Sequence, residues 1–409
     1  MSAVITFFPV DNGDMTLIQL DSGRSILIDI NIRASTDDGV RDVLADLRAR
    51  LKKDDKERHY VDAMLLTHPD QDHCRGMAEH FHLGPLADYS DPEEGEDGKI
   101  VIREMWSSPM VFRRQSSEHK LCADAQDWAT EARRRAKLFK SKQTAISGDH
   151  IQIMGEDEGD KNDGLEAILV KSGQIITKID GETDKTFSGF LLAPKGKGDA
   201  AEEERRSKNH SSVIIRFSIA NGANADATKY LAGGDALVGI WERIWTDHKS
   251  EKEVLEYHIL SAPHHCSWRS LSYESWGDTD GEAEMCKFAR KALGQALESA
   301  YIVASSKTVV DDEDDPPCIG AKSEYEEILG ALGGTFVNTA EHKFKGDVMP
   351  MEFEVTDLGP VLQAAGSTLG KKAVMKVAGA GFAYAAVKER VEASNSRNRV
   401  EKRGETRFA

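Results

Sequence analysis

A run of seven residues packs four potential metal ligands into six positions. Residues 67–73 read Thr-His-Pro-Asp-Gln-Asp-His, which places His68, Asp70, Asp72 and His73 close together in the chain. The run follows the short apolar segment 63–66, which we expect to be a strand. Imidazole and carboxylate groups bind divalent cations, and four of them at this density favour a site for two metal ions. The run therefore predicts a metal-dependent hydrolase.

Two further polar clusters follow predicted strands. Asp235 comes after two glycines at the end of the predicted strand 229–232, and His264 and His265 follow the predicted strand 254–262. Taken singly, a Gly-Gly-Asp sequence is usually a turn and a histidine is usually a structural hydrogen-bonding residue. Taken with the first run, they can complete a two-metal site, because such a site collects ligands from several strand ends around one opening.

These motifs resemble those of the metallo-β-lactamase-fold hydrolases, whose signature is His-x-His-x-Asp-His, then a later His, a Gly-Asp and a final His. Within that superfamily the chain is most similar to the ComEC-type competence hydrolase domain and its free-standing relatives, which also have Asp at the second ligand position. Further motifs of that group match the turn at residues 10–14, the strand at 27–29, the lead into a strand at 209–212 and the segment 264–270. The resemblance covers roughly residues 3–345.

The resemblance implies an α/β fold, namely an αββα sandwich of the metallo-β-lactamase type with charged loop insertions and a C-terminal helical extension. It implies a hydrolase domain at 1–345 and an extension at 346–409 with a helix and a basic tail. It also implies roles for the ligands: His68 and Asp70 hold one metal ion with either His264 or His265, Asp72 and His73 hold the other, and Asp235 bridges both. Asp72, His264 and His265 are the expected catalytic residues.

The expected reaction is hydrolysis of a phosphodiester, by a nuclease or another phosphodiesterase. Asp70 is a harder ligand than histidine, so it favours manganese, or magnesium, while zinc stays possible. DNA, RNA and smaller phosphodiesters are candidate substrates, a separate partner protein is a candidate, and a defence or DNA-processing system would suit a free-standing copy. The alternatives are a hydrolase of small esters, lactones or lactams and a non-catalytic scaffold with a decayed metal site.

Composition places limits on the partners and the compartment. The chain has 409 residues and a net charge of −17, which disfavours non-specific binding to nucleic acid or to an anionic membrane. It has no uninterrupted apolar stretch of membrane-spanning length. The five cysteines show no CxxC spacing and no N-terminal signal pattern is evident, so we expect a cytoplasmic protein.

Three features depart from the family pattern or add to it. Cys266 replaces the usual glycine after the two histidines, and no third-motif histidine is obvious, although His150 and His210 are candidates. The predicted helix 126–142 contains three consecutive arginines, which we expect on an exposed face where they could contact phosphate.

Overall fold

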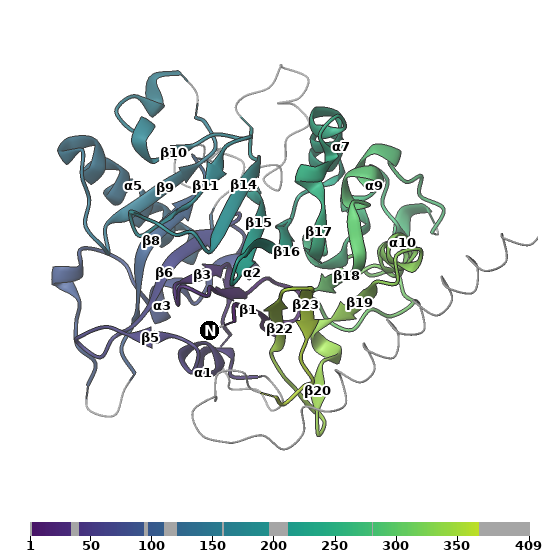
Figure 1. Ribbon diagram of the computed structural model, residues 1–409, viewed down its shortest axis with the longest axis horizontal. Helices are drawn as coiled ribbons and strands as arrows, with labels where there is room; N and C mark the ends of the chain where they lie inside the picture. The colour runs from purple at the N-terminus through teal and green to yellow at the C-terminus, as the bar shows by residue number, and fades with distance from the viewer. Residues whose placement is uncertain are drawn as a thin grey trace, which may run out of the picture. The chain divides into compact units, whose positions relative to one another are not determined.

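The computed structural model describes residues 2–33, 41–93, 97–109, 121–157, 159–195, 212–279 and 281–367. These residues form a mixed α/β fold with two large sheets (Figure 1). The predicted C-terminal helix, the basic tail and His210 lie outside the described residues. Within the described residues, no helix is long and apolar enough to cross a membrane.

The first sheet has eleven strands and combines parallel and antiparallel pairing. Its main path, in spatial order, is β10 (Leu169–Val170), β9 (His150–Met154), β8 (Ile100–Ser107), β6 (His59–Leu66), β3 (Ser25–Ile28), β2 (Thr16–Gln19), β1 (Val4–Phe7), β22 (Met351–Thr356) and β23 (Gly359–Leu362). The short strands β5 (Lys52–Lys53) and β7 (Phe81–His82) pair with β6 and β8. The strands from β3 to β10 along this path are parallel, whereas β1, β2, β3, β22 and β23 pair antiparallel.

The second sheet has seven strands. In spatial order they are β11 (Ile175–Ile176), β14 (Phe187–Ala193), β15 (Ile214–Asn221), β16 (Asn224–Ala232), β17 (Tyr257–Ser261), β18 (Ala296–Ala304) and β19 (Thr335–Asn338). The strands from β16 to β19 are parallel, and the others are antiparallel. Two small hairpins, β12 (Lys178–Ile179) with β13 (Glu182–Thr183) and β20 (Lys343–Phe344) with β21 (Asp347–Val348), stand apart from the two sheets.

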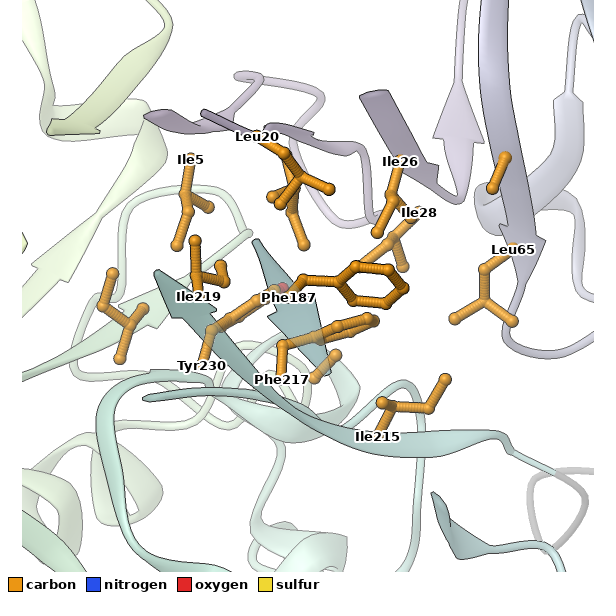
Figure 2. Close-up of a cluster of buried hydrophobic side chains, with 14 of the residues drawn as sticks. Ile5, Leu20, Ile26, Ile28, Leu65, Phe187, Ile215, Phe217, Ile219 and Tyr230 are labelled. Atoms are coloured by element: carbon orange, nitrogen blue, oxygen red, sulfur yellow. The ribbon is translucent and has the colours of Figure 1, made fainter. Parts of the chain in front are cut away.

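A hydrophobic cluster joins the two sheets. It contains Ile26, Ile28 and Leu65 from the first sheet together with Ile215 and Phe217 from the second, and Figure 2 shows these side chains directed into one shared layer. Because neighbouring residues of a strand point to opposite faces, Leu27 and Ile214 fall into other clusters. Strands that bury both faces in this way read as continuous apolar runs, as these do in the sequence.

Helices cover the outer faces of both sheets. On the first sheet, α1 (Val43–Arg48) and α5 (Ala123–Lys142) share a hydrophobic cluster with β6, β8 and β9. On the second, α7 (Val238–His248), α9 (Lys287–Leu293) and α10 (Ile319–Gly330) share another cluster with β14 to β18, and Figure 1 shows them beside β17, β18 and β19. Three very short helices, α2 (Gln71–Cys74), α3 (Met77–His80) and α8 (Pro263–Cys266), follow strands or lie next to them.

The segment that we assigned to a C-terminal extension contributes to the first sheet. Strand β22 pairs with β1, and β23 pairs with β22. In β22, the side chains of Met351, Phe353 and Val355 are buried in the cluster between the sheets. The compact unit accordingly continues to Ser367.

Candidate metal centre

The predicted ligand run begins where strand β6 ends. His68 lies in the turn after the strand, and α2 carries Asp72 and His73; both histidines are fully buried. The Nε2 atom of His68 is 3.2 Å from Asp235 Oδ2, and the Nε2 atom of His73 is 3.1 Å from Asp235 Oδ1. The carboxyl ends of parallel strands are where α/β proteins commonly bind ligands, and β6 follows this rule.

Asp235 reaches the same point from the second sheet. It follows strand β16 and is 2% exposed. Gly234 has a φ of +48°, and a Cβ at this position would lie 3.2 Å from the Cβ of Thr67, so a glycine allows the two loops to approach. Burial opposes the charge of Asp235, but the nearby His73, His265 and His68 hold its pKa well below the usual range. Asp235 is therefore an ionised carboxylate among imidazoles.

His264 and His265 follow strand β17 in an unusual backbone conformation. Their φ values are +52° and +55°, and that of Cys266 is +70°, so three successive residues other than glycine are left-handed. Each such residue costs about 1–2 kcal/mol, and strain of this kind is concentrated at functional sites. It also explains why a glycine would suit position 266. Cys266 is buried in the hydrophobic cluster beneath α7 and α10, as expected for a small apolar residue.

The two histidines of this pair face different oxygens of Asp235. His264 Nε2 is 3.6 Å from Oδ2, whereas His265 Nε2 is 3.4 Å from Oδ1 and 3.2 Å from Asp72 Oδ2. Asp70 completes the Oδ2 side, with an oxygen 3.8 Å from His68 Nε2. Each oxygen of Asp235 therefore faces two imidazoles and has one carboxylate of the first run nearby.

Asp14 is a further acid at the centre that the sequence did not identify as a ligand. A ligand atom from each of Asp14, His73, Asp235 and His265 lies within 4.8 Å of the others, so this group could hold a metal ion. Burial raises the pKa of Asp14. The signal in the sequence was the turn at residues 10–14, which matched a family motif without an assigned role. A backbone hydrogen bond of 3.2 Å from Asp14 N to Asp72 O ties this turn to the ligand run.

Asp29 orients His73 from behind. Its Oδ2 lies 2.8 Å from His73 Nδ1, and its Oδ1 accepts a 2.7 Å hydrogen bond from Thr67 N. A proton on Nδ1 leaves the lone pair of Nε2 directed towards Asp235. Carboxylates in this position fix the tautomer and orientation of metal-binding histidines, and their loss weakens metal binding. Asp29 is fully buried, so this contact is shielded from water.

Several buried polar atoms of the cluster make no hydrogen bond. They include the Nε2 atoms of His68, His73 and His265 and the Oδ1 atom of Asp235. These ring nitrogens lie 3.1–3.4 Å from an oxygen of Asp235, so several imidazoles and a carboxylate converge on one point. Buried polar atoms are normally satisfied by hydrogen bonds, and imidazole and carboxylate groups that converge in this way suit a cation. The residues present therefore fit divalent metal ions.

Other residues singled out in the sequence lie elsewhere. His150 begins β9 and its Nδ1 is 2.7 Å from Asp180 Oδ1, in a pair that does not include the clustered ligands. In the segment 264–270, the Ser267 hydroxyl oxygen accepts a hydrogen bond from Arg269 N. The expectation of an exposed arginine face on α5 is wrong in part, because Arg135 is 1% exposed and Arg134 is bonded to Glu131 and Asp149.

Comparison with known proteins adds little to this geometry. No family model matches the chain, and no curated protein matches it. A solved structure described as unliganded yeast PDE1 is similar at 9% sequence identity, with a TM-score of 0.38, over 82% of this chain and 97% of that one. A likeness of that extent carries no argument about activity. The fold and the site define an α/β protein with a buried histidine and aspartate cluster that could bind a metal ion.

Proposed function

We propose that this chain is a metal-dependent phosphodiesterase whose fold is the αββα sandwich of the metallo-β-lactamase type. The observation that carries the proposal is the surroundings of Asp235. One of its oxygens faces His68 and His264, and the other faces His73 and His265. A carboxylate buried between two pairs of imidazole nitrogens is suited to bridge two cations.

The ligands divide between the two oxygens. His68, Asp70 and His264 would hold one cation, while Asp72, His73 and His265 would hold the other with Asp14 beside them. When bound, two divalent cations supply an activated nucleophile and neutralise negative charge on a phosphate. Asp29 keeps His73 in the required tautomer. The hydrophobic cluster between the two sheets holds together the strands that the ligands follow.

The acid content of the site favours phosphodiesters over lactams. Asp14, Asp70, Asp72 and Asp235 give the centre four carboxylates, which suit hard cations such as Mn²⁺ and Mg²⁺ and also permit Zn²⁺. In many enzymes, such hard cations are bound by carboxylates together with the phosphate groups of the substrate. A nuclease role, a partner protein, a cytoplasmic location and the ComEC-type relationship stay predictions.

The test compares substrates and metals on one preparation. Metal-free protein is supplied in turn with Mn²⁺, Zn²⁺ or Mg²⁺ and assayed on bis-p-nitrophenyl phosphate, DNA, RNA and nitrocefin. The proposal expects phosphodiester cleavage that needs the cation and is lost in Asp72→Ala, whose fold is checked by circular dichroism. The variant Asp180→Asn, which alters an Asp–His pair outside the cluster, should keep full activity.

Two outcomes would contradict the proposal. Cleavage of nitrocefin without cleavage of any phosphodiester would favour the small-molecule hydrolase instead. No metal uptake and no activity on any substrate would favour the scaffold.

Among phosphodiesters, a polymer substrate should bind less tightly as salt increases, because phosphate contacts displace counterions.

A further inference from the structure

Two cysteines lie side by side next to the metal centre. The Sγ atoms of Cys74 and Cys122 are 3.5 Å apart, and both residues are free thiols. Cys74 is fully buried at the end of α2, directly after His73. Cys122 is half-buried and immediately precedes α5. Neither thiol has a part in the proposed hydrolysis.

Other contacts keep these thiols together. The Asp124 carboxylate accepts 3.2 Å hydrogen bonds from Gly76 N and Ala78 N, which ties the start of α5 to the chain that follows α2. The Cys74 thiol also donates to the Asp70 carbonyl oxygen at 3.2 Å, so it lies against the ligand run. The two sulfurs therefore meet because the surrounding structure holds both segments.

The two thiols differ in reactivity. Cys122 is half-buried and open in part to solvent, whereas Cys74 is fully buried and its S–H is donated to the Asp70 carbonyl oxygen. A thiolate is the reactive form of cysteine, and partial exposure gives an oxidant access to it. Cys122 is thus suited to react first and Cys74 to react second.

We propose that Cys74 and Cys122 form a disulfide when a peroxide oxidises them, and that this bond weakens cation binding on the His73 side of Asp235. The Cys122 thiolate attacks hydrogen peroxide, the O–O bond breaks, and a sulfenic acid forms with release of hydroxide, which takes up the proton that the Cys122 thiol had lost and leaves as water. The Cys74 sulfur then attacks the Cys122 sulfur, the S–O bond breaks, and a second water leaves with the Cys74 proton. The two thiols lose two electrons, and the peroxide gains them.

The expected effect on the metal centre follows from distances. A disulfide has its sulfurs about 2.05 Å apart, so the atoms now 3.5 Å apart must approach by about 1.5 Å. Cys74 is the neighbour of His73, whose Nε2 is 3.1 Å from Asp235 Oδ1. Metal–ligand distances in proteins lie within about 0.2 Å of their standard values. A movement of Cys74 that shifts His73 by more than this lowers the affinity of the site for the cation. This consequence rests on the proposed function, whereas formation of the disulfide does not.

The experiment oxidises the whole protein with hydrogen peroxide and measures two things. Peptide mapping without reductant identifies the cross-linked peptides, and titration with Mn²⁺, which binds thiols weakly, measures cation affinity. Cys122→Ser removes the bond. Cys286→Ser is the matched control, because Cys286 is also a free, half-buried cysteine that immediately precedes a helix, α9.

The proposal predicts a Cys74–Cys122 peptide in the wild type and in Cys286→Ser, and none in Cys122→Ser. In the same two proteins Mn²⁺ affinity should fall about tenfold or more on oxidation and return with dithiothreitol, comparable to the loss of a contact that orients a ligand. Absence of the cross-link while other thiols oxidise would overturn it, and so would a cross-link with unchanged affinity. Reduced protein that binds no Mn²⁺ would instead overturn the proposed function, and the peptide map would still decide the disulfide.

Discussion

The protein buries charged groups at several places, and two of these places treat them differently. On α5, every guanidinium nitrogen of Arg135 donates a hydrogen bond, to Glu131 or to backbone carbonyl oxygens. At the candidate metal centre, ring nitrogens of four histidines and one oxygen of Asp235 have no hydrogen bond, although the imidazoles lie close to the carboxylate. Burying polar groups without hydrogen bonds is costly, so a fold keeps such groups where a ligand completes them. The comparison agrees with a structural role for the first place and with the metal-binding role that we propose for the second.

Replacing the shared carboxylate should have the largest effect. Asp235→Asn keeps the shape of the side chain and removes the charge that lies between four imidazoles. We expect Mn²⁺ affinity to fall by more than the about 100-fold that supporting residues typically contribute, with loss of phosphodiesterase activity. Isothermal titration and circular dichroism check binding and fold. Retained affinity would show that Asp235 does not hold the cations.

Disrupting the structural network should give the opposite result. Arg135→Met leaves Glu131 buried with only Arg134 as its partner. Breaking a buried ion pair costs about 3–5 kcal/mol, and the remaining arginine favours the lower end of that range. Urea denaturation measures this loss. The folded fraction should bind Mn²⁺ with unchanged affinity. A loss of Mn²⁺ binding free energy as large as the loss of folding free energy would mean that the network on α5 also supports the metal centre.

Two Asp–His pairs allow a sharper test of orientation. Asp29 and His73 lie 2.8 Å apart inside the cluster, and Asp180 and His150 lie 2.7 Å apart outside it. We expect Asp29→Asn to lower Mn²⁺ affinity by about 10- to 100-fold, because His73 loses its fixed tautomer. The matched variant Asp180→Asn should leave the affinity unchanged. If both variants reduced affinity equally, a general loss of stability would explain the result.

The pH dependence of stability gives a further test, which follows the proton on one histidine of the cluster. Burial lowers the pKa of His265, but Asp235 and Asp72 outweigh it and raise the value to about 9 in the metal-free protein. A folded-state pKa above the unfolded value of about 6.5 gives stability below pH 6.5, which is lost as pH rises through 9.

A bound cation replaces that proton, so the Mn²⁺ complex should not lose this contribution. The gap between the urea midpoints of the Mn²⁺-bound and metal-free proteins should therefore widen from pH 6.5 to pH 9. A gap that narrows over this range would mean that protons and cations do not compete at the cluster.

Much of the centre could be predicted because its ligands follow apolar strands. His68 to His73, Asp235, His264 and His265 are polar residues at abrupt ends of apolar runs, and the structure brings all of them together. The sequence left open which histidine of the last pair binds metal. The left-handed backbone turns both towards Asp235, and that conformation has no clear signal in the sequence.

Other features depended on tertiary structure. Arg135 looked like part of an exposed basic run, but it is seven residues after the buried Trp128 and so lies on the same face of α5. The strand β22 had a signal that we did not use, since Met351, Phe353 and Val355 alternate with glutamates. Asp14 and Asp29 lie in segments that match family motifs, but those matches assigned them no role, which becomes visible only where separate loops approach one another.

We propose that each oxygen of Asp235 supports one divalent cation. The most direct measurement is the metal content of the purified protein after Mn²⁺ loading and removal of free metal, by mass spectrometry, beside Asp235→Asn. We expect two Mn²⁺ per chain in the wild type and none in the variant. A wild-type value near zero, or an equal value in both proteins, would contradict it.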